Sequence, residues 1–198
     1  MKRMSFDGES ITAILAGRKT ETTRVVKPQP VLTESPFRDD NLTWWVWKTD
    51  VKLMTDALED NLIETARYHV GDIVAVTETW APANDNANSI VFKADGLLHA
   101  PPIYFAAEDQ DVPCYWKPAR FMPADLSRIT IEITSVAAGR VQEMTLAQIG
   151  SEGFTNEMWR DISPQDWWQR RWDALNPQFP YESNPWVRRY GFKVLEVK

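Results

Sequence analysis

Hydrophobic and polar positions alternate most regularly in the middle of the chain, where the pattern predicts strands. Ile129, Ile131 and Ile133 alternate with polar residues, which predicts a strand over residues 128–137 with one buried face. Residues 73–79 are apolar on both faces, so we expect a central strand that is covered on both sides. Less regular patterns favour further strands over residues 19–26, 43–48, 89–94 and 190–197.

Apolar residues at helical spacing, together with residues that favour the start or the end of a helix, predict helices between these strands. Residues 8–17 place their apolar side chains on one face and end at Gly17, which suits the left-handed end of a helix. Residues 96–114 are expected to be irregular because they contain several prolines. Strands with non-local pairing, combined with helices, predict an α+β fold. The other expected helices run from Thr145 to about Gly150 or Gly153, from Ser163 to about Leu175 and, with weaker spacing, over residues 56–67.

The segment from Gly17 to Arg24 departs from the pattern of a structural strand. After the glycine it carries basic residues, threonines and a glutamate, and no large apolar residue appears before Val25. A strand that only supports the core would alternate apolar and polar residues. Polar groups on both faces indicate that at least one face lines a wet cavity or a ligand site. An exposed edge strand would have a similar composition.

The composition is typical of one compact domain, since 43% of the 198 residues are hydrophobic. No run of about 18 apolar residues occurs, so we expect no membrane span, and the early Asp7 argues against a signal peptide. Cys114 is the single cysteine and has no partner for an internal disulfide. His69, His99 and Cys114 lack the spacing of metal ligands. We therefore expect a cytoplasmic protein with neither a metal nor another cofactor.

The net charge of -6 disfavours extensive, non-specific binding of nucleic acid, which usually requires a basic protein. A small nucleoside or a short, locally held strand remains compatible with this charge. The pairs Arg170–Arg171 and Arg188–Arg189 are local basic clusters, although such pairs are also common on solvated surfaces.

Gly17, Lys19, Thr22 and Arg24 resemble the Gly-x-Lys-x-x-(Thr/Glu)-x-Arg signature of the ASCH family. The resemblance implies a PUA-like open β-barrel with flanking helices, formed by a single domain over residues 1–198. Further segments that are similar to this family, or to its longer phage and prophage variants, are residues 68–74, 128–133, 191–197, 25–30, 78–82 and 184–187. Two segments depart from its shortest members and are expected to be insertions, at about residues 31–67 and 81–127.

The resemblance also implies an activity. ASCH-type bacterial amidohydrolases use the lysine and threonine of the signature, with a glutamate after the central strand, to remove an acyl group from the exocyclic amine of cytidine. The matching residues here are Lys19, Thr22 and Glu152. Thr22 would be the nucleophile and Lys19 the base, provided that burial and the nearby Arg24 favour its neutral form. Glu152 would protonate the leaving nitrogen, and Arg24 would stabilise the oxyanion or hold a carbonyl.

The arrangement of these residues raises one geometric condition. Residues three apart in a regular strand point to opposite faces, so Lys19 and Thr22 converge only if Lys19 lies in the turn after Gly17, or if a bulge intervenes. Glu21 is a competing carboxylate on the same strand. The other candidate contacts to substrate are Glu21, Arg24, Trp80, Arg120 and Arg128, and structural ion pairing is an equal alternative for the last two.

Three functions stay open at this point. The first is an amidohydrolase that acts on an acylated or otherwise modified cytosine nucleoside. The second is a non-catalytic PUA-like reader of a modified base or a short RNA, which requires only a basic groove with aromatic side chains. The third is a ribonuclease, which is known among ASCH proteins. The expected partner is a modified nucleoside or a short RNA and not a membrane, and the sequence leaves the oligomeric state open.

Overall fold

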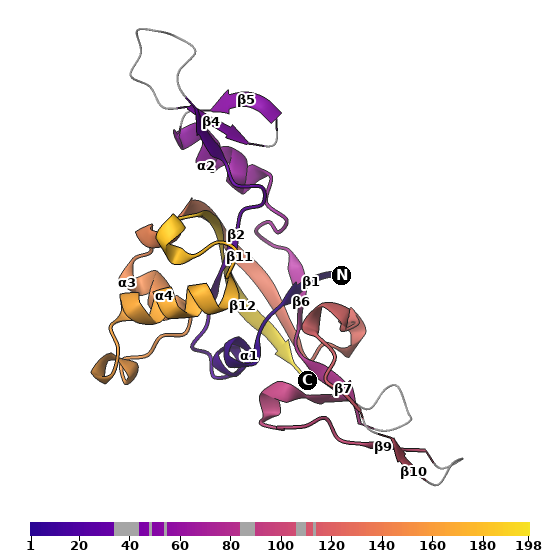
Figure 1. The fold of residues 1–198 in the computed structure, drawn as a ribbon. Coiled ribbons are helices and arrows are strands. Elements are labelled where there is room, and N and C mark those ends of the chain that lie inside the picture. Colours follow the sequence, from indigo (N-terminus) through magenta and orange to yellow (C-terminus); the bar gives the residue numbers. More distant parts are fainter. Residues whose placement is uncertain (34–43, 48, 54, 84–89, 106–109, 113) are drawn as a thin grey trace, which may run out of the picture. The chain divides into compact units, whose positions relative to one another are not determined.

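The computed structural model describes the chain except for residues 34–43, 48, 54, 84–89, 106–109 and 113 (Figure 1). Its largest sheet has five strands in the order β1-β6-β11-β12-β2, with parallel and antiparallel pairs. The five strands are β1 (Lys2–Ser5), β6 (Ile73–Thr77), β11 (Ile129–Arg140), β12 (Trp186–Val197) and β2 (Glu21–Val25). The two outer strands of this order are β1 and β2, so the sheet is open. Mixed strand pairing together with helices confirms the predicted α+β class.

The chain forms two compact units. The first unit consists of residues Met1–Lys19, Gly71–Ile133 and Phe192–Lys198, and the second consists of Thr20–Val70 and Thr134–Gly191. The two long strands β11 and β12 each contribute residues to both units. The single domain over residues 1–198 stays a prediction.

The first unit is built around β6, which pairs with β1 on one side and with the first half of β11 on the other. Residues Val74–Val76 are buried, as expected for a central strand, and Ile129, Ile131 and Ile133 are fully buried beside it. The helix α1 (Gly8–Leu15) contributes Ile11 and Ile14 to this core. The strand β1 was not predicted, because its four residues show no alternation that a sequence pattern could detect.

Small elements extend the first unit between β6 and β11. The predicted strand 73–79 ends at Thr77, and the predicted strand 89–94 is shorter than expected. Residues 96–114, which were expected to be irregular, include an antiparallel hairpin. These elements are β7 (Trp80–Pro82) paired with β8 (Ile90–Phe92), β9 (Ile103–Phe105) paired with β10 (Gln110–Val112), and the 3₁₀ helices η1 (Lys93–Asp95), η2 (Ala119–Phe121) and η3 (Ala124–Leu126).

The second unit combines β2 and the first half of β12 with a smaller sheet and three α-helices. The smaller sheet has the order β3 (Val31–Thr33), β4 (Trp44–Trp47) and β5 (Thr49–Leu53), and α2 (Thr55–Glu64) follows it. The helices α3 (Leu146–Ser151) and α4 (Pro164–Leu175) contact each other (Figure 1). The 3₁₀ helices of this unit are η4 (Val141–Glu143), η5 (Met158–Arg160) and η6 (Tyr181–Ser183).

The helix boundaries of the second unit follow from local capping. Thr145 and Ser163 cap α3 and α4, and each side chain accepts a hydrogen bond from a backbone N–H of the first turn. Both helices therefore begin where the sequence predicts. One buried cluster consists of Val141, Met144, Ile149, Trp168, Trp172 and Val187, and another consists of Val26, Leu58, Leu62, Ala138 and Trp186.

Two expected strands differ from their observed bounds for physical reasons. The strand predicted over residues 19–26 begins only at Glu21, because the preceding residues belong to the turn that ends α1. The final strand begins at Trp186, earlier than expected, and contains Gly191. A Cβ atom at Gly191 would lie 2.3 Å from Ser135 Oγ, so a larger residue at this position of β12 would force the Ser135 side chain on β11 to move. The predicted boundary residues 43, 48 and 89 lie outside the described residues.

Among the described residues, no helix has the length and apolar character that crossing a membrane requires.

Candidate functional site

Lys19 lies in the turn that follows α1. Gly17 has a φ of 69°, and the backbone N–H groups of Arg18 and Lys19 both donate to the carbonyl of Ala13, at 2.9 and 3.1 Å. The first of these bonds closes a Schellman motif, which ends the helix and turns the chain. Lys19 therefore precedes β2, so the alternation of strand faces does not separate it from Thr22. Its side chain is buried, at 3% exposure. Lys19 ends the first unit and Thr22 belongs to the second, and their convergence stays a prediction.

The strand β2 has one face toward the core and one face that carries polar groups. Thr23 Oγ1 donates to Met144 Sδ at 3.7 Å, and Val25 packs against the cluster around Val141. Thr22 and Arg24 alternate with these residues and so lie on the opposite face. Thr22 is nevertheless buried, at 4% exposure. The second face of β2 is thus both polar and covered.

The end of α3 lies beside the start of β2. The backbone N–H of Thr20 donates to the carbonyl of Ser151 at 2.9 Å, which joins the two elements directly. Glu152 is the next residue and ends the helix, and Gly153 follows with a φ of 114°. The Glu152 side chain is buried, at 5% exposure. The sequence segments that carry Thr22 and Glu152 are therefore neighbours in the fold of the second unit.

Tyr190 is a candidate that the sequence did not reveal. It pairs with Thr22 in the antiparallel register of β12 and β2, and directly opposite residues place their side chains on the same face. Its ring is buried and meets the ring of Tyr68 edge to face, with 5.3 Å between the centroids. Burial raises the pKa of Tyr190, although the charges of Arg188 and Arg24 act in the opposite direction. Tyr190 therefore presents a neutral phenol beside Thr22 at neutral pH.

Arg188 is the second residue that only the strand register reveals. It pairs with Arg24, so two guanidinium groups lie on the same face as Thr22 and Tyr190. Arg188 Nε donates to the Leu62 carbonyl at 2.6 Å, and its Nη2 donates to Thr65 Oγ1 at 3.2 Å. Burial lowers the pKa of Arg188. The alternation of Arg188 and Tyr190 in the sequence was a visible signal, but their partners on β2 were not.

These observations describe a covered polar face on β2 and β12, to which the carboxylate at the end of α3 is adjacent. The structural neighbours include an ASCH domain. That structure, from Lactobacillus crispatus, is 15% identical to this chain, with a TM-score of 0.34, and the match covers 92% of this chain and 68% of the other. Protein EF3133 from Enterococcus faecalis, described as a DUF984 protein, is 11% identical with a TM-score of 0.44, and the match covers 100% and 78% of the two chains. No protein-family model and no curated protein matches the sequence.

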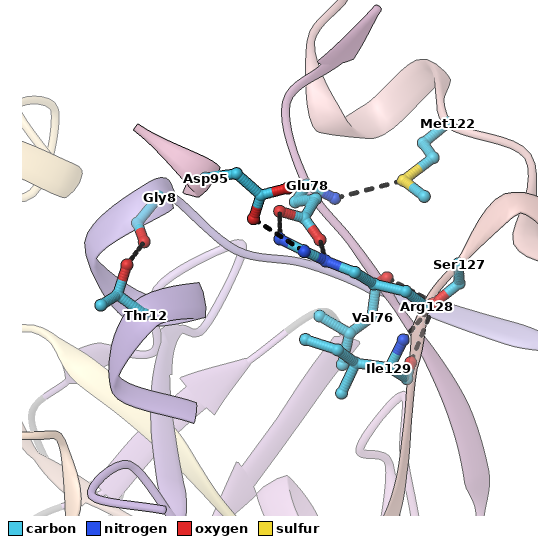
Figure 2. A network of polar contacts seen from close by, with 9 residues as sticks. All are labelled: Gly8, Thr12, Val76, Glu78, Asp95, Met122, Ser127, Arg128 and Ile129. Carbon is cyan, nitrogen blue, oxygen red and sulfur yellow. Dashed lines mark hydrogen bonds and ion pairs between the residues drawn. The ribbon is translucent and has the colours of Figure 1, made fainter. Parts of the chain in front are cut away.

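Arg128 lies in the first unit, inside a cluster of ionic contacts (Figure 2). Its Nε and Nη2 donate to the two carboxylate oxygens of Glu78 at 2.8 and 3.0 Å, and Nη1 pairs with Asp95 at 2.7 Å. The guanidinium carbon is also 4.1 Å from the centroid of the Phe92 ring. These contacts match the structural alternative that the sequence left open, and a contact between Arg128 and substrate stays a prediction.

Burial and pairing oppose each other in this cluster. Burial raises the pKa of Glu78, whose side chain is 1% exposed, while the hydrogen bond and charge of Arg128 lower it. Burial works to lower the pKa of Arg128, but Glu78 and Asp95 together raise it. Nearby polar contacts hold the surrounding backbone, since Glu78 N–H donates to Met122 Sδ and Ser127 Oγ donates to the Val76 carbonyl (Figure 2).

The remaining predicted contacts are divided between the units. Trp80 and Arg120 belong to the first unit, where Lys117 Nζ lies 4.9 Å from the centroid of the buried Trp80 ring. Arg120 lies on the surface, with its guanidinium 4.7 Å from the Phe121 ring centroid. Glu21 belongs to the second unit and pairs with Gly191 across the strands. A role in substrate binding stays a prediction for Trp80, Arg120 and Glu21.

Within the part of the chain that the structure describes, no group of three or more His, Cys, Asp or Glu side chains is arranged to hold a metal ion. The chemistry that the site residues themselves offer is that of a hydroxyl, a carboxylate, a phenol and two guanidinium groups.

Proposed function

We propose that this protein is an amidohydrolase that removes the acyl group from the exocyclic amine of an acylated or otherwise modified cytosine nucleoside. The observation that carries the proposal is the hydrogen bond from Thr20 N–H to the Ser151 carbonyl, which brings β2 and its Thr22 next to the end of α3 and Glu152. Both side chains are buried, and burying polar groups costs free energy that a purely structural strand would avoid. The ASCH resemblance of the sequence supports a hydrolase or an RNA-binding role.

In the first half of the proposed reaction, Thr22 Oγ1 attacks the acyl carbonyl carbon and transfers its proton to neutral Lys19. Burial of an ammonium group favours its neutral form, and Lys19 is buried. Arg24 stabilises the oxyanion of the tetrahedral intermediate. Glu152 protonates the exocyclic nitrogen as the carbon–nitrogen bond breaks, which releases the free amine and leaves the acyl group as an ester on Thr22.

In the second half, a water molecule attacks this ester. Before this attack, Lys19 passes the proton that it took from Thr22 to the Glu152 carboxylate, so both residues regain their starting forms. Lys19 then accepts a proton from the water and donates it to Thr22 Oγ1 as the ester bond breaks, which releases the carboxylic acid and restores the Thr22 hydroxyl. The net reaction consumes one water for each amide that is cleaved.

The neighbouring threonines of β2 provide a matched test. Thr22→Ala should reduce deacylation of N4-acetylcytidine by at least about 1,000-fold, as expected when a nucleophile is removed. Thr23→Ala removes a hydroxyl from the adjacent position on the core face and should leave turnover within a few fold of the original. Chromatographic detection of cytidine measures the rate, and thermal melting checks that both variants fold. Deacylation by Thr22→Ala at the original rate would exclude Thr22 as the nucleophile.

A non-catalytic reader of a modified base or a short RNA is the second candidate. It is supported by Tyr190, Arg24 and Arg188, which lie on one face and could hold a ligand without any reaction. Equilibrium binding of a modified nucleoside, without release of product, would favour this function. The ribonuclease alternative has less support, because His99 belongs to the first unit and His69 Nε2 is within hydrogen-bond distance of the Glu64 carbonyl.

A further inference from the structure

Three aromatic rings form a connected group in the second unit, directly after the helix that ends at Glu152. The ring of Phe154 meets the rings of Trp159 and Trp167 edge to face, with centroid separations of 6.2 and 5.5 Å. Phe154 and Trp167 pack against the buried cluster around Val141. Trp159 is the outermost of the three and is 54% exposed. These three rings are called the aromatic surface below.

Backbone hydrogen bonds account for the conformation of the segment that carries Trp159. This residue lies in η5, where Trp159 N–H donates to the Asn156 carbonyl at 3.3 Å and Ile162 N–H donates to the Met158 carbonyl at 3.0 Å. Because these bonds involve the backbone alone, the turn does not require a large aromatic side chain. A half-exposed ring also contributes less to the core than a buried one. A tryptophan in such a position is typical of a surface that binds a partner.

The charge around the aromatic surface is mixed, which indicates the kind of partner it fits. The guanidinium carbon of Arg171 lies 6.0 Å from the centroid of the Trp167 ring. Arg160 is exposed, but Glu157 and Asp161 lie beside it in the sequence. Together with the net charge of -6, this mixture disfavours a partner that is held mainly through phosphates. Stacking of nucleobases on aromatic rings does not depend on a basic surface, and it tolerates any base sequence.

The position of the aromatic surface relative to Glu152 indicates which bases it meets. In the proposed reaction Thr22 attacks the acyl carbon, whereas Glu152 protonates the nitrogen that leaves with the base. The cytosine therefore lies on the Glu152 side of the acyl group. Phe154 follows Glu152 by two residues, so their Cα atoms are at most about 7.6 Å apart. This is the span of about two stacked nucleotides, at about 3.4 Å each.

We propose that the aromatic surface stacks the bases that flank the modified cytosine, so that the substrate is a short single strand and not a free nucleoside. This inference rests on the proposed function for the position of the cytosine. Trp159 is the principal contact, because its ring is the most exposed of the three. RNA and single-stranded DNA offer the same stacking chemistry, and the comparison of substrates distinguishes them.

The first experiment compares substrates with the unmodified protein. Deacylation is measured for N4-acetylcytidine and for short oligoribonucleotides and oligodeoxyribonucleotides that carry the acetylated base, with either intact or abasic neighbours. We expect kcat/KM to be at least about fivefold higher for one type of intact strand than for the nucleoside, which is the lower limit for one stacked base. Abasic neighbours should remove this gain, and the preferred sugar identifies RNA or DNA. Equal values for the nucleoside and the intact strands, or for intact and abasic neighbours, would overturn the inference while leaving the amidohydrolase intact.

The second experiment removes the most exposed ring. Trp159→Ala should lower kcat/KM for the intact strand by about fivefold and leave the value for the nucleoside unchanged. It should cause no further loss with abasic neighbours, because the same contact is already missing. Phe121→Ala removes a ring of the first unit that is 60% exposed and should change neither value. Trp159→Phe, which keeps an aromatic ring, retains most of the strand preference and serves if the alanine variant does not fold. Equal effects at Trp159 and Phe121 would refute the proposed contact.

A binding measurement separates this inference from the proposed catalysis. Fluorescence anisotropy follows a labelled short strand with a central unmodified cytosine, and unlabelled cytidine is the competitor. If no substrate is turned over but the strand binds more tightly than cytidine and only Trp159→Ala removes the difference, the aromatic surface stands and the amidohydrolase fails. If Trp159→Ala binds the strand as tightly as the original protein, the aromatic surface is wrong whatever the activity. Affinity should fall by less than about tenfold between about 50 and about 200 mM salt, and a much steeper loss would show that phosphates hold the strand instead.

Discussion

Arg128 and Arg188 show two contrasting environments for the same side chain. In the first unit, Arg128 is paired with two carboxylates, Glu78 and Asp95, and its guanidinium lies over an aromatic ring. In the second unit, Arg188 donates to neutral acceptors and faces another arginine across the strands. The first arrangement brings opposite charges together and ties the residue that precedes β11 to neighbouring segments of the same unit. The second places two like charges in directly opposite positions of an antiparallel strand pair.

The contrast predicts that removing the two arginines has different consequences for folding. A buried carboxylate that loses its partner becomes an uncompensated charge, whereas the loss of one of two facing cations removes a repulsion.

Arg128→Gln should lower the free energy of unfolding by about 3 kcal/mol at neutral pH, because Glu78 stays buried after its partner is removed. The loss should become smaller at acidic pH, where the carboxyl is protonated. Urea unfolding at several pH values measures both effects. Asp95→Asn is the matched control: Asp95 is largely exposed, so its removal should cost less than about 1 kcal/mol. Equal losses for the two variants would mean that the Glu78–Arg128 pair does not hold the unit.

Arg188→Gln should lower the free energy of unfolding by less than Arg128→Gln does, because the loss of the hydrogen bonds to the Leu62 carbonyl and the Thr65 hydroxyl is partly offset by relief of the repulsion from Arg24. Urea unfolding measures this change, with Arg189→Gln, which removes the same charge from the next residue, as the control. A destabilisation as large as that of Arg128→Gln would assign Arg188 to the support of the fold and remove the contrast.

Tyr190 gives the smallest effect, a change in the pH dependence of stability. Burial raises the folded-state pKa of Tyr190 above its usual value near 10, so its contribution is present below about pH 10 and is lost as pH rises through the folded pKa. The difference in unfolding free energy between the original protein and Tyr190→Phe should be constant near pH 8 and should shrink at more alkaline pH. Ultraviolet absorbance of the tyrosinate form provides an independent titration. A Tyr190 that ionises like an exposed tyrosine would not be the buried phenol that pairs with Thr22.

Local sequence signals were sufficient for the helices and for the two most regular strands. Thr145 and Ser163 cap α3 and α4 as predicted, and Gly17 ends α1 in the left-handed conformation. These features depend on residues within one or two turns of each other, so a short window of sequence contains the whole interaction. The short strand β1 and the hairpin of β9 and β10 were missed because their stability depends on pairing and not on their own pattern.

The candidate site shows the same division between local and non-local information. The sequence alone placed Thr22 and Arg24 on a polar strand and, through its resemblance to ASCH proteins, singled out Lys19 and Glu152. It could not place Tyr190 beside Thr22, because alternation assigns residues to faces but does not say which residue of another strand lies opposite.

Only the tertiary structure decided that register, and with it the proximity of α3 to β2 and the pairing of Arg188 with Arg24. These contacts join segments that are far apart in the chain, so they form only when the packing of the whole second unit compensates for the entropy of closing long loops. The sequence determined the elements, their polar faces and the chemical groups they carry. The cooperative packing of the unit determined which of those groups meet.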